Sequence, residues 1–294
     1  MTERRTAYLT LLVGMLAFGG TWPAGKLAAA HVPPAVVAVA RFASAALLLW
    51  LWARLSGRRV PRPRRADVPL VLVLGATVVF AYNLFFLYGV RHSTAADGSV
   101  LVPGLIPVAT ALLAWIVRGE RPPPRSQLGL AVAFAGLLLV ASPTGDVGSD
   151  RVLGDVLFVG AAISWAVYTL AGRVATARYG SVSANVYATS AGTVLLLPLT
   201  FIDGGWSPLV HAPAGALAGI AYLSVIGTVL GFVAFYEGVR LIGAARAASF
   251  ALLVPIFGVL SSVLVLHEHL RWTLAVGAAI VITGLALAES NRSG

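Results

Sequence analysis

GSVLVPGLIPVATALLAWIV, residues 98–117, is an uncharged stretch that ends at a charged Arg-Gly-Glu-Arg group. A helix needs about 20 apolar residues to cross roughly 30 Å of membrane hydrocarbon, so this stretch is long enough to span a bilayer. A second uncharged stretch, residues 247–267, matches it, because Pro107 aligns with Pro255 at an offset of 148 residues. We therefore predict that residues 98–117 form one of a pair of repeated transmembrane helices.

Similar runs fill the rest of the 294-residue chain, of which 59% is hydrophobic and only 11% charged. Soluble domains carry about 25% charged residues, so this composition indicates a protein dissolved in lipid. The sequence predicts an all-α integral membrane protein with ten transmembrane helices. The other nine runs are residues 6–25, 33–53 (interrupted by Arg41), 68–90, 126–145, 156–172, 179–202, 204–236, 247–267 and 272–288.

The chain contains an internal repeat, with residues 1–147 as the first half and residues 148–294 as the second. Glu120 aligns with Glu268 at an offset of 148, and a Gly-Val-Arg sequence at 89–91 recurs at an offset of 149. Five crossings per half is an odd number, so the second half is expected to be inverted in the membrane. Inverted repeats are typical of transporters that hold their substrate near the bilayer midplane. We expect one membrane domain around a central cavity.

The net charge of +10 is distributed asymmetrically between the predicted loops. With a cytoplasmic amino terminus, sixteen arginines lie in cytoplasmic segments and three in external loops. This bias predicts a multi-pass protein of a bacterial-type inner membrane with both termini in the cytoplasm. The basic run at residues 58–65 is then an anchor to anionic lipid, and a nucleic-acid partner is not expected. No cysteine is present, which excludes disulfides and thiolate chemistry.

The order of short motifs resembles the EamA-type members of the drug/metabolite transporter superfamily over essentially the whole chain. The matching features are Arg41-Phe42, the Gly-Val-Arg at 89–91, a central proline in the fourth helix, Gly-Glu-Arg at 119–121 and the run from Gln127 to Leu137. Within this family the chain is most similar to the YddG-type amino-acid exporters. The resemblance implies export of small metabolites, foremost aromatic or apolar amino acids, by alternating access and without an organic cofactor. A monomer would suffice for this activity.

Aromatic and polar side chains at mid-span are the candidate substrate-binding residues. Phenylalanine also serves as ordinary core, and Trp and Tyr form belts at membrane interfaces. Arg41 has three interpretations: snorkelling to the headgroups, capture of a substrate carboxylate, or a structural contact to a kinked helix. Asn83 either bridges two helices or orients the substrate. The predicted binding residues are Phe18, Trp22, Arg41, Tyr82, Asn83, Phe86, Trp165, Tyr168, Tyr187 and Phe232.

Three prolines are candidate gating residues, namely Pro103, Pro107 and Pro255. A proline inside a helix removes one backbone hydrogen bond and bends the helix. The bend is either a static feature that improves packing or a hinge that lines the transport path.

The acidic residues bear on ion coupling and on rival functions. No acidic residue occurs in the middle of a predicted span; Asp97 and Glu237 come nearest. Small multidrug-resistance relatives carry a glutamate in their first helix for proton exchange, and this chain has none there. We therefore expect no buried carboxylate for proton coupling, with a proton-coupled multidrug or other metabolite exporter as the alternative. An intramembrane enzyme would need clustered acids or histidines, whereas the five histidines and eleven acids of this chain are scattered at predicted loops. A channel would need a polar stripe along a helix, and no predicted span has one.

The remaining charged residues have structural interpretations. Lys26 is expected to snorkel at the external end of the first helix. Glu120 and Glu268 are expected to stabilise helix starts and to pair with Arg121 or Arg271. The sequence His267-Glu268-His269 lacks the spacing of a zinc hydrolase, so no metal site is predicted.

Overall fold

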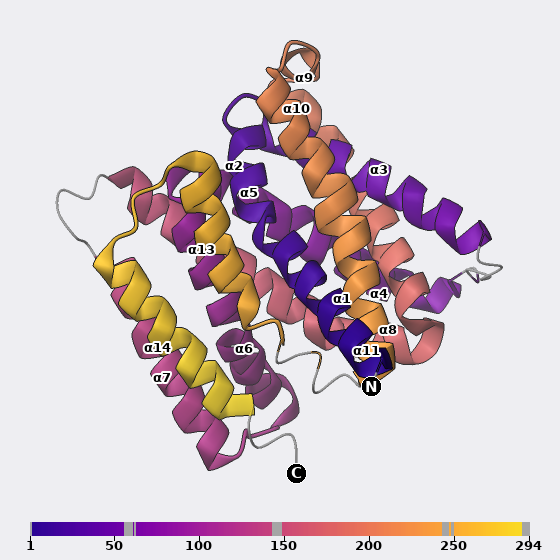
Figure 1. The fold of residues 1–294 in the computed structure, drawn as a ribbon. Coiled ribbons are helices and arrows are strands. Elements are labelled where there is room, and N and C mark those ends of the chain that lie inside the picture. The colour runs from indigo at the N-terminus through magenta and orange to yellow at the C-terminus, as the bar shows by residue number, and fades with distance from the viewer. Residues whose placement is uncertain are drawn as a thin grey trace.

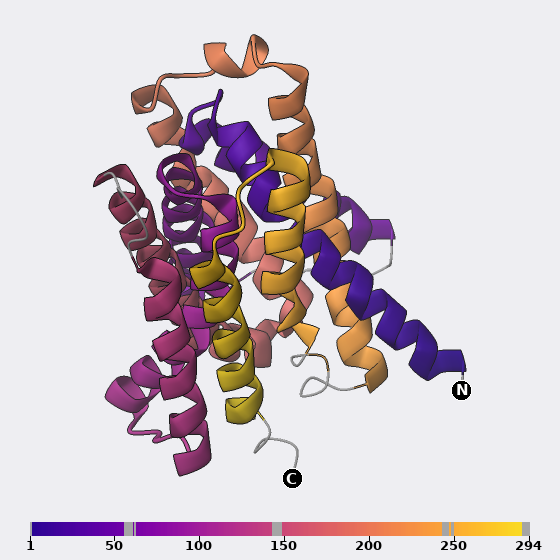
Figure 2. The ribbon, with the colours of Figure 1, turned by 60° about the vertical axis from the view of Figure 1, so that its left-hand side comes forward.

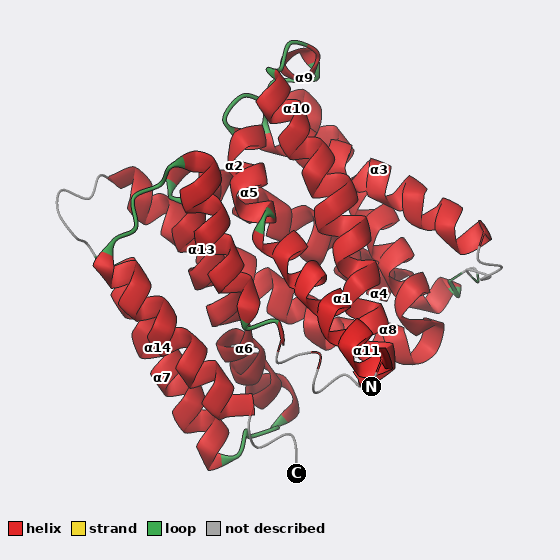
Figure 3. Cartoon of the chain, in the orientation of Figure 1, coloured by secondary structure: helices red, strands yellow, loops and turns green. Residues whose placement is uncertain are grey.

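The computed structural model describes residues 2–55, 61, 63–142, 149–242, 247 and 250–289, and within these ranges every regular element is a helix (Figure 3). The first half contains α1 (Thr2–Gly19), α2 (Thr21–Ala29), α3 (Pro34–Leu55), η1 (Arg65–Asp67), α4 (Val68–Leu74), η2 (Gly75–Ala81), α5 (Tyr82–His92), α6 (Ala95–Arg118) and α7 (Pro124–Ala141). The second half contains α8 (Ser149–Ile202), α9 (Ser207–Val210), α10 (Ala214–Ala221), η3 (Tyr222–Leu230), α11 (Gly231–Ile242), α13 (Leu253–Leu266) and α14 (Trp272–Glu289).

Seven helical stretches in the described residues are long and apolar enough to cross a membrane, so the chain is a multi-pass membrane protein. These stretches are Arg5–Ala29, Arg65–His92, Ala95–Arg118, Pro124–Ala141, Ser149–Gly180, Ser183–Ile202 and Ala214–Phe235. Three shorter apolar helices are found where the remaining spans are predicted, at Pro34–Leu48, Leu253–Leu266 and Trp272–Ala288.

The helices form one bundle in which segments distant in sequence lie side by side. Helices α7 and α14 run along each other at one edge, and α1 packs on α11 at another (Figure 1). The short α9 lies across one end of the bundle, while α1 begins and α14 ends toward the opposite end (Figure 2). The α7–α14 contact is close because glycines line it: a Cβ added to Gly284 would lie 2.4 Å from the backbone nitrogen of Ala133. Small residues of this kind are common where membrane helices meet.

Two long helices contain π-helical segments at corresponding places in the two halves. Segment η2 joins α4 to α5, and segment η3 joins α10 to α11. A π-helical turn widens the backbone spacing and frees polar groups, and such turns are frequent at functional sites. The sequence analysis did not anticipate them.

Helix α8 comprises two helices that meet at Gly180, where the backbone has φ 78° and ψ 161°. Glycine adopts a positive φ without the steric cost of a Cβ, which permits the sharp reversal there. Helix α8 begins at Ser149, so Asp155 belongs to a helix.

The candidate gating prolines lie in different settings. Pro103 and Pro107 are inside α6, which the structure assigns as one helix. Pro255 lies in the first turn of α13, directly after a turn at residues 251–252. In a continuous helix residue 255 would donate to the carbonyl of Ala251, and that carbonyl accepts instead from the Val254 amide at 3.0 Å. The missing proline N–H thus coincides with the start of α13.

Candidate functional site

A buried arginine lies at the contact between the two halves of the chain. Arg41, on α3, is only 8% exposed. Its Nε donates to Thr228 Oγ1 at 3.0 Å, and its Nη1 donates to Asn83 Oδ1 at 3.1 Å. The side chain also lies over the ring of Phe42, with 4.9 Å from Cζ to the ring centroid. Snorkelling to the headgroups is therefore wrong as an interpretation of Arg41.

The two partners of Arg41 are fixed by the π-helical segments. Asn83 Nδ2 donates to the carbonyl of Val78 at 2.8 Å, and Thr228 Oγ1 donates to the carbonyl of Leu223 at 2.8 Å. Each bond reaches back five residues along its own helix, and both side chains are buried, at 1% exposure. Asn83 was predicted at the site, whereas Thr228 was missed because a threonine in an apolar run resembles many others.

Five of the predicted aromatic residues form a continuous chain of ring contacts. Trp165 lies 5.0 Å from Tyr82 and 5.8 Å from Tyr168, measured between centroids. Phe86 stacks on Tyr82 at 6.2 Å and meets Trp22 edge-on at 4.9 Å. Trp22 and Phe86 are buried, whereas the other three rings are half-buried and keep surface available.

A second polar side chain at this site, Asn185, was also missed from the sequence. Tyr168 Oη donates to Asn185 Oδ1 at 3.2 Å. A partly buried phenol needs such a partner, and the partner lies on the second part of α8, beyond the reversal at Gly180.

Three other predicted residues lie apart from this chain. Phe18 and Phe232 contact each other, with their centroids 5.5 Å apart. The Tyr187 hydroxyl donates to the carbonyl of Pro61, and its ring meets Tyr179 at 5.5 Å. Tyr179 in turn donates to Asp67, so Tyr187 belongs to a polar group at a helix end rather than to the aromatic chain.

A second polar group surrounds the start of α6; we call it the α6 N-terminal cluster (Lys26, Ser93, Asp97, Arg151, Asp155, Glu268 and Arg271). Asp97 is fully buried, accepts a hydrogen bond from Arg271 and lies 3.4 Å from Arg151 Nε. Ser93 Oγ donates to Asp155 Oδ1 at 2.9 Å. This cluster joins side chains from both halves of the chain.

Glu268 supplies the other part of this cluster. Its Oε1 lies 3.0 Å from Lys26 Nζ, and its two oxygens accept from the backbone amides of Ala95 and Ala96, each at 2.9 Å. These amides are the first of α6, whose N–H groups have no partner inside the helix. The expected pairing of Glu268 with Arg271 and the snorkelling of Lys26 are therefore wrong: Arg271 binds Asp97, and Lys26 binds Glu268.

Glu120 forms weaker contacts at the other end of α6. It lies 3.5 Å from Arg118 and 3.8 Å from Arg173, and its side chain is 53% exposed. The expected partner Arg121 instead lies over the ring of Trp115. Exposed pairs of this kind contribute about 0–1 kcal/mol.

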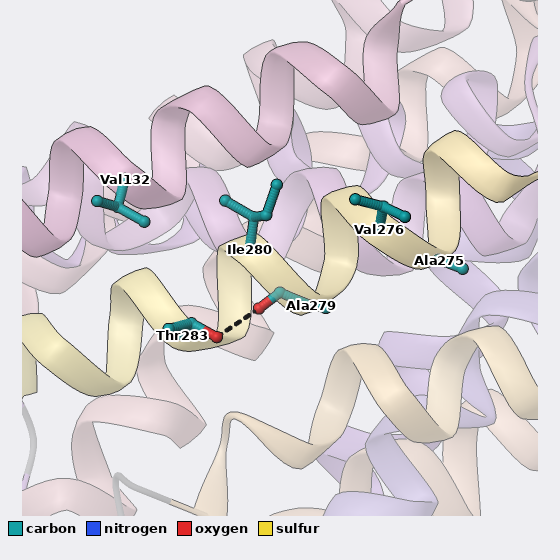
Figure 4. A pocket seen from close by; sticks show the side chains of 6 residues that line it. All are labelled: Val132, Ala275, Val276, Ala279, Ile280 and Thr283. Carbon is teal, nitrogen blue, oxygen red and sulfur yellow. Dashed lines mark hydrogen bonds between the residues drawn. The ribbon is translucent and has the colours of Figure 1, made fainter.

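Two surface grooves lie elsewhere in the bundle. One runs between α7 and α14 and is almost entirely aliphatic; its polar hydroxyl, on Thr283, bonds to the carbonyl of Ala279 at 2.8 Å (Figure 4). Another lies between α6 and α7 and includes Trp115 and Gln127. Neither groove is lined by a predicted substrate-binding residue. Across the described ranges, no three His, Cys, Asp or Glu side chains gather as metal ligands.

Comparison with known proteins identifies the family of this chain. The model of the EamA-like transporter family matches residues 5–142 and matches again at residues 152–289. The chain belongs to the EamA-like transporter family. The same family model therefore matches each half of this EamA-like protein.

Several transporters resemble this EamA-like chain along its length. The uncharacterized transporter YdeK of Bacillus subtilis (strain 168) is 31% identical over 286 residues, covering 96% of each protein. An uncharacterized transporter of Archaeoglobus fulgidus is 28% identical and covers 97% of this chain and 98% of its own. A "probable terminal-alkyne amino-acid exporter" of Streptantibioticus cattleyicolor is 30% identical, covering 98% of this chain and 95% of its own.

A solved crystal structure shares the fold of this family member. It aligns with a TM-score of 0.67 and 21% identity, and the alignment covers 99% of both chains. This agreement concerns the arrangement of the helices alone.

Proposed function

We propose that this EamA-like protein is an inner-membrane transporter that crosses the membrane ten times and exports small metabolites, foremost aromatic and apolar amino acids, by alternating access. The observation that carries the proposal is the set of side-chain contacts between the halves at mid-span. Tyr82 of the first half contacts Trp165 of the second, and Arg41 of the first binds Thr228 of the second. A substrate held among these groups would touch both halves at once.

The polar contacts at the helix ends support ten crossings with both termini in the cytoplasm. That topology places Lys26, Ser93 and Glu268 at one membrane face, and these residues bond to each other. It places Asp67 and Arg178 at the opposite face, and these two are also paired. The three shorter apolar helices then act as spans alongside the seven longer ones, with the second half inverted relative to the first.

The chemistry of the site supports an amino acid as cargo. Half-buried rings of Tyr82, Trp165 and Tyr168 offer apolar surface, and the neighbouring Arg41 and Asn83 offer polar groups. A small molecule with one apolar and one polar part fits this combination. The similarity to a relative named as a probable amino-acid exporter points in the same direction.

Efflux from proteoliposomes tests the proposal. Vesicles preloaded with phenylalanine should release it through the purified protein, and Trp165→Ala and Tyr82→Ala should each slow release about tenfold, since a lost aromatic contact removes about 0.5–1.5 kcal/mol besides its buried area. Trp115→Ala is the matched control, because Trp115 is 46% exposed and lies outside the aromatic chain. Wild-type vesicles that release no amino acid would exclude this cargo. Site variants that both release phenylalanine at the wild-type rate would place the substrate elsewhere.

A further inference from the structure

We infer that Arg41 is the receptor for a carboxylate on the transported molecule, and that Asn83 and Thr228 keep it available by binding it through uncharged oxygens. This inference rests on the proposed function and narrows its substrate class. The transported molecule would be a carboxylate-bearing compound with an apolar or aromatic side chain. Free amines without a carboxylate would be excluded.

Arg41 has no counter-charge among the described residues. Arg41 is 8% exposed, yet within the described residues no carboxylate lies within ion-pair distance of it. Other buried charges in the same protein are paired: Asp97 has two arginines, and Glu268 has Lys26. An ion removed from water without a partner carries a desolvation cost of several kcal/mol. A ligand carboxylate would supply the missing charge.

The Arg41 guanidinium uses only part of its hydrogen-bonding capacity among the described residues. A guanidinium has five N–H donors in a planar fork that suits a carboxylate. Arg41 donates its Nε–H and one N–H of Nη1, and its other N–H groups have no partner among the described residues. Asn83 and Thr228 hold the fork from two sides, and each is tied to its own backbone through a π-helical segment.

The aromatic chain begins beside the partner of Arg41. Tyr82 directly precedes Asn83, whose side chain accepts a hydrogen bond from Arg41. Its ring contacts Trp165 at 5.0 Å. A carboxylate on Arg41 would therefore leave the apolar part of the same molecule near the rings of Tyr82 and Trp165. The Phe42 ring also lies beside Arg41, so the alternative is that the arginine has a purely structural role. An experiment that varies the charge of the cargo distinguishes this role from carboxylate binding.

Asn83→Asp is the decisive variant, because it keeps the size of the side chain and puts a carboxylate beside Arg41. We expect it to raise the KM for phenylalanine roughly tenfold to hundredfold, as a lost charge-assisted bond would. The variant also loses the hydrogen bond from Asn83 Nδ2 to the Val78 carbonyl, because an ionised carboxylate has no N–H to donate. The protein should remain folded, since the new charge pairs with Arg41. Gln127→Glu is the matched control: it makes the same change of amide to acid on the exposed start of α7.

Three probes give the readout: phenylalanine, 3-phenylpropionate and 2-phenylethylamine, each measured as efflux and as the rise it causes in the unfolding temperature. Wild-type protein should be stabilised by the two carboxylates and not by the amine, and Asn83→Asp should lose this preference. Arg41→Lys should retain part of it, and Arg41→Gln none. A wild-type protein that treats phenylalanine and 2-phenylethylamine alike, or an Asn83→Asp variant with unchanged preference, overturns the inference while amino-acid export stands. If wild-type vesicles move no amino acid, export fails, and the stabilisation by 3-phenylpropionate still decides the carboxylate site.

Discussion

The α6 N-terminal cluster predicts that Asp97→Asn opens one face of the transporter. The variant removes a fully buried charge that accepts from Arg271 and lies 3.4 Å from Arg151. Loss of one partner from a buried ion pair costs about 3–5 kcal/mol. The two arginines are 23% and 16% exposed, and Arg151 also lies 3.9 Å from Asp155, so part of that cost is recovered. We expect a net loss of roughly 2 kcal/mol.

The ion pairs of Asp97 would stabilise the closed state of that face. Asp97 belongs to α6 of the first half, whereas its partners belong to the second half, so the contacts must separate if the halves move apart there. A loss of roughly 2 kcal/mol would raise the population of the open state about 30-fold. Because the chain has no cysteine, Ser262→Cys provides a single reporter thiol. Ser262 is fully buried near the end of α13, and its hydroxyl has no hydrogen-bond partner among the described residues, so the replacement is mild.

The assay is the rate at which a membrane-impermeant maleimide labels Ser262→Cys in oriented vesicles. Labelling should be about 30-fold faster with Asp97→Asn. It should be unchanged with Glu120→Gln, because the ion pairs of Glu120 are exposed to solvent. If Asp97→Asn lowers the unfolding temperature without faster labelling, the cluster stabilises the fold as a whole and does not hold a gate. If neither quantity changes, the contacts contribute no energy and the argument fails.

Three further predictions concern stability. Gly284→Val should prevent α7 from packing on α14 and lower the yield of folded protein, since even a Cβ at this position would overlap the α7 backbone. Gly172→Ala is the control: it has open space around it and should be neutral or stabilising by up to about 1 kcal/mol in thermal unfolding. Glu268→Gln should lower stability by about 1–2 kcal/mol in denaturant titrations, because it loses the Lys26 pair and one of two amide contacts. Tyr187→Phe should cost about 1 kcal/mol in the same titrations and leave the KM for phenylalanine unchanged, and a raised KM would return Tyr187 to the substrate site.

The positions of the helices could be predicted because hydrocarbon imposes a length and a composition on each span. The uncharged run at residues 98–117 corresponds to α6, Ala95–Arg118, and the run at 272–288 corresponds to α14, Trp272–Glu289. The π-helical segments could not be predicted in this way. Apolar composition alone does not distinguish a π-helical turn from an α-helical one, and the residues of η2 would suit either.

The partners of charged residues were the least predictable feature. From the sequence, Arg271 was the expected partner of Glu268 because the two are near neighbours. In the structure Glu268 binds Lys26, which is 242 residues away in sequence. The site shows the same limit. Tyr82, Trp165 and Asn83 could be singled out as aromatic or polar groups at mid-span, but Thr228 gained its role only through the approach of η3 to α3. Local chemistry therefore identified candidate residues, and long-range packing decided which of them meet.

The distribution of charge also separates amino-acid export from export of lipophilic cations. The acids of the α6 N-terminal cluster are engaged with lysine, arginine and serine side chains, and Asp67 is engaged with Arg178. Glu237, on α11, lies nine residues beyond Thr228, or about 13 Å along a helix, from the level of Arg41. A cationic drug at the aromatic chain would thus meet an arginine, and two like charges 4 Å apart repel by about 4 kcal/mol near a protein surface. A zwitterion would turn the same arginine into an attraction, as the proposed carboxylate site requires.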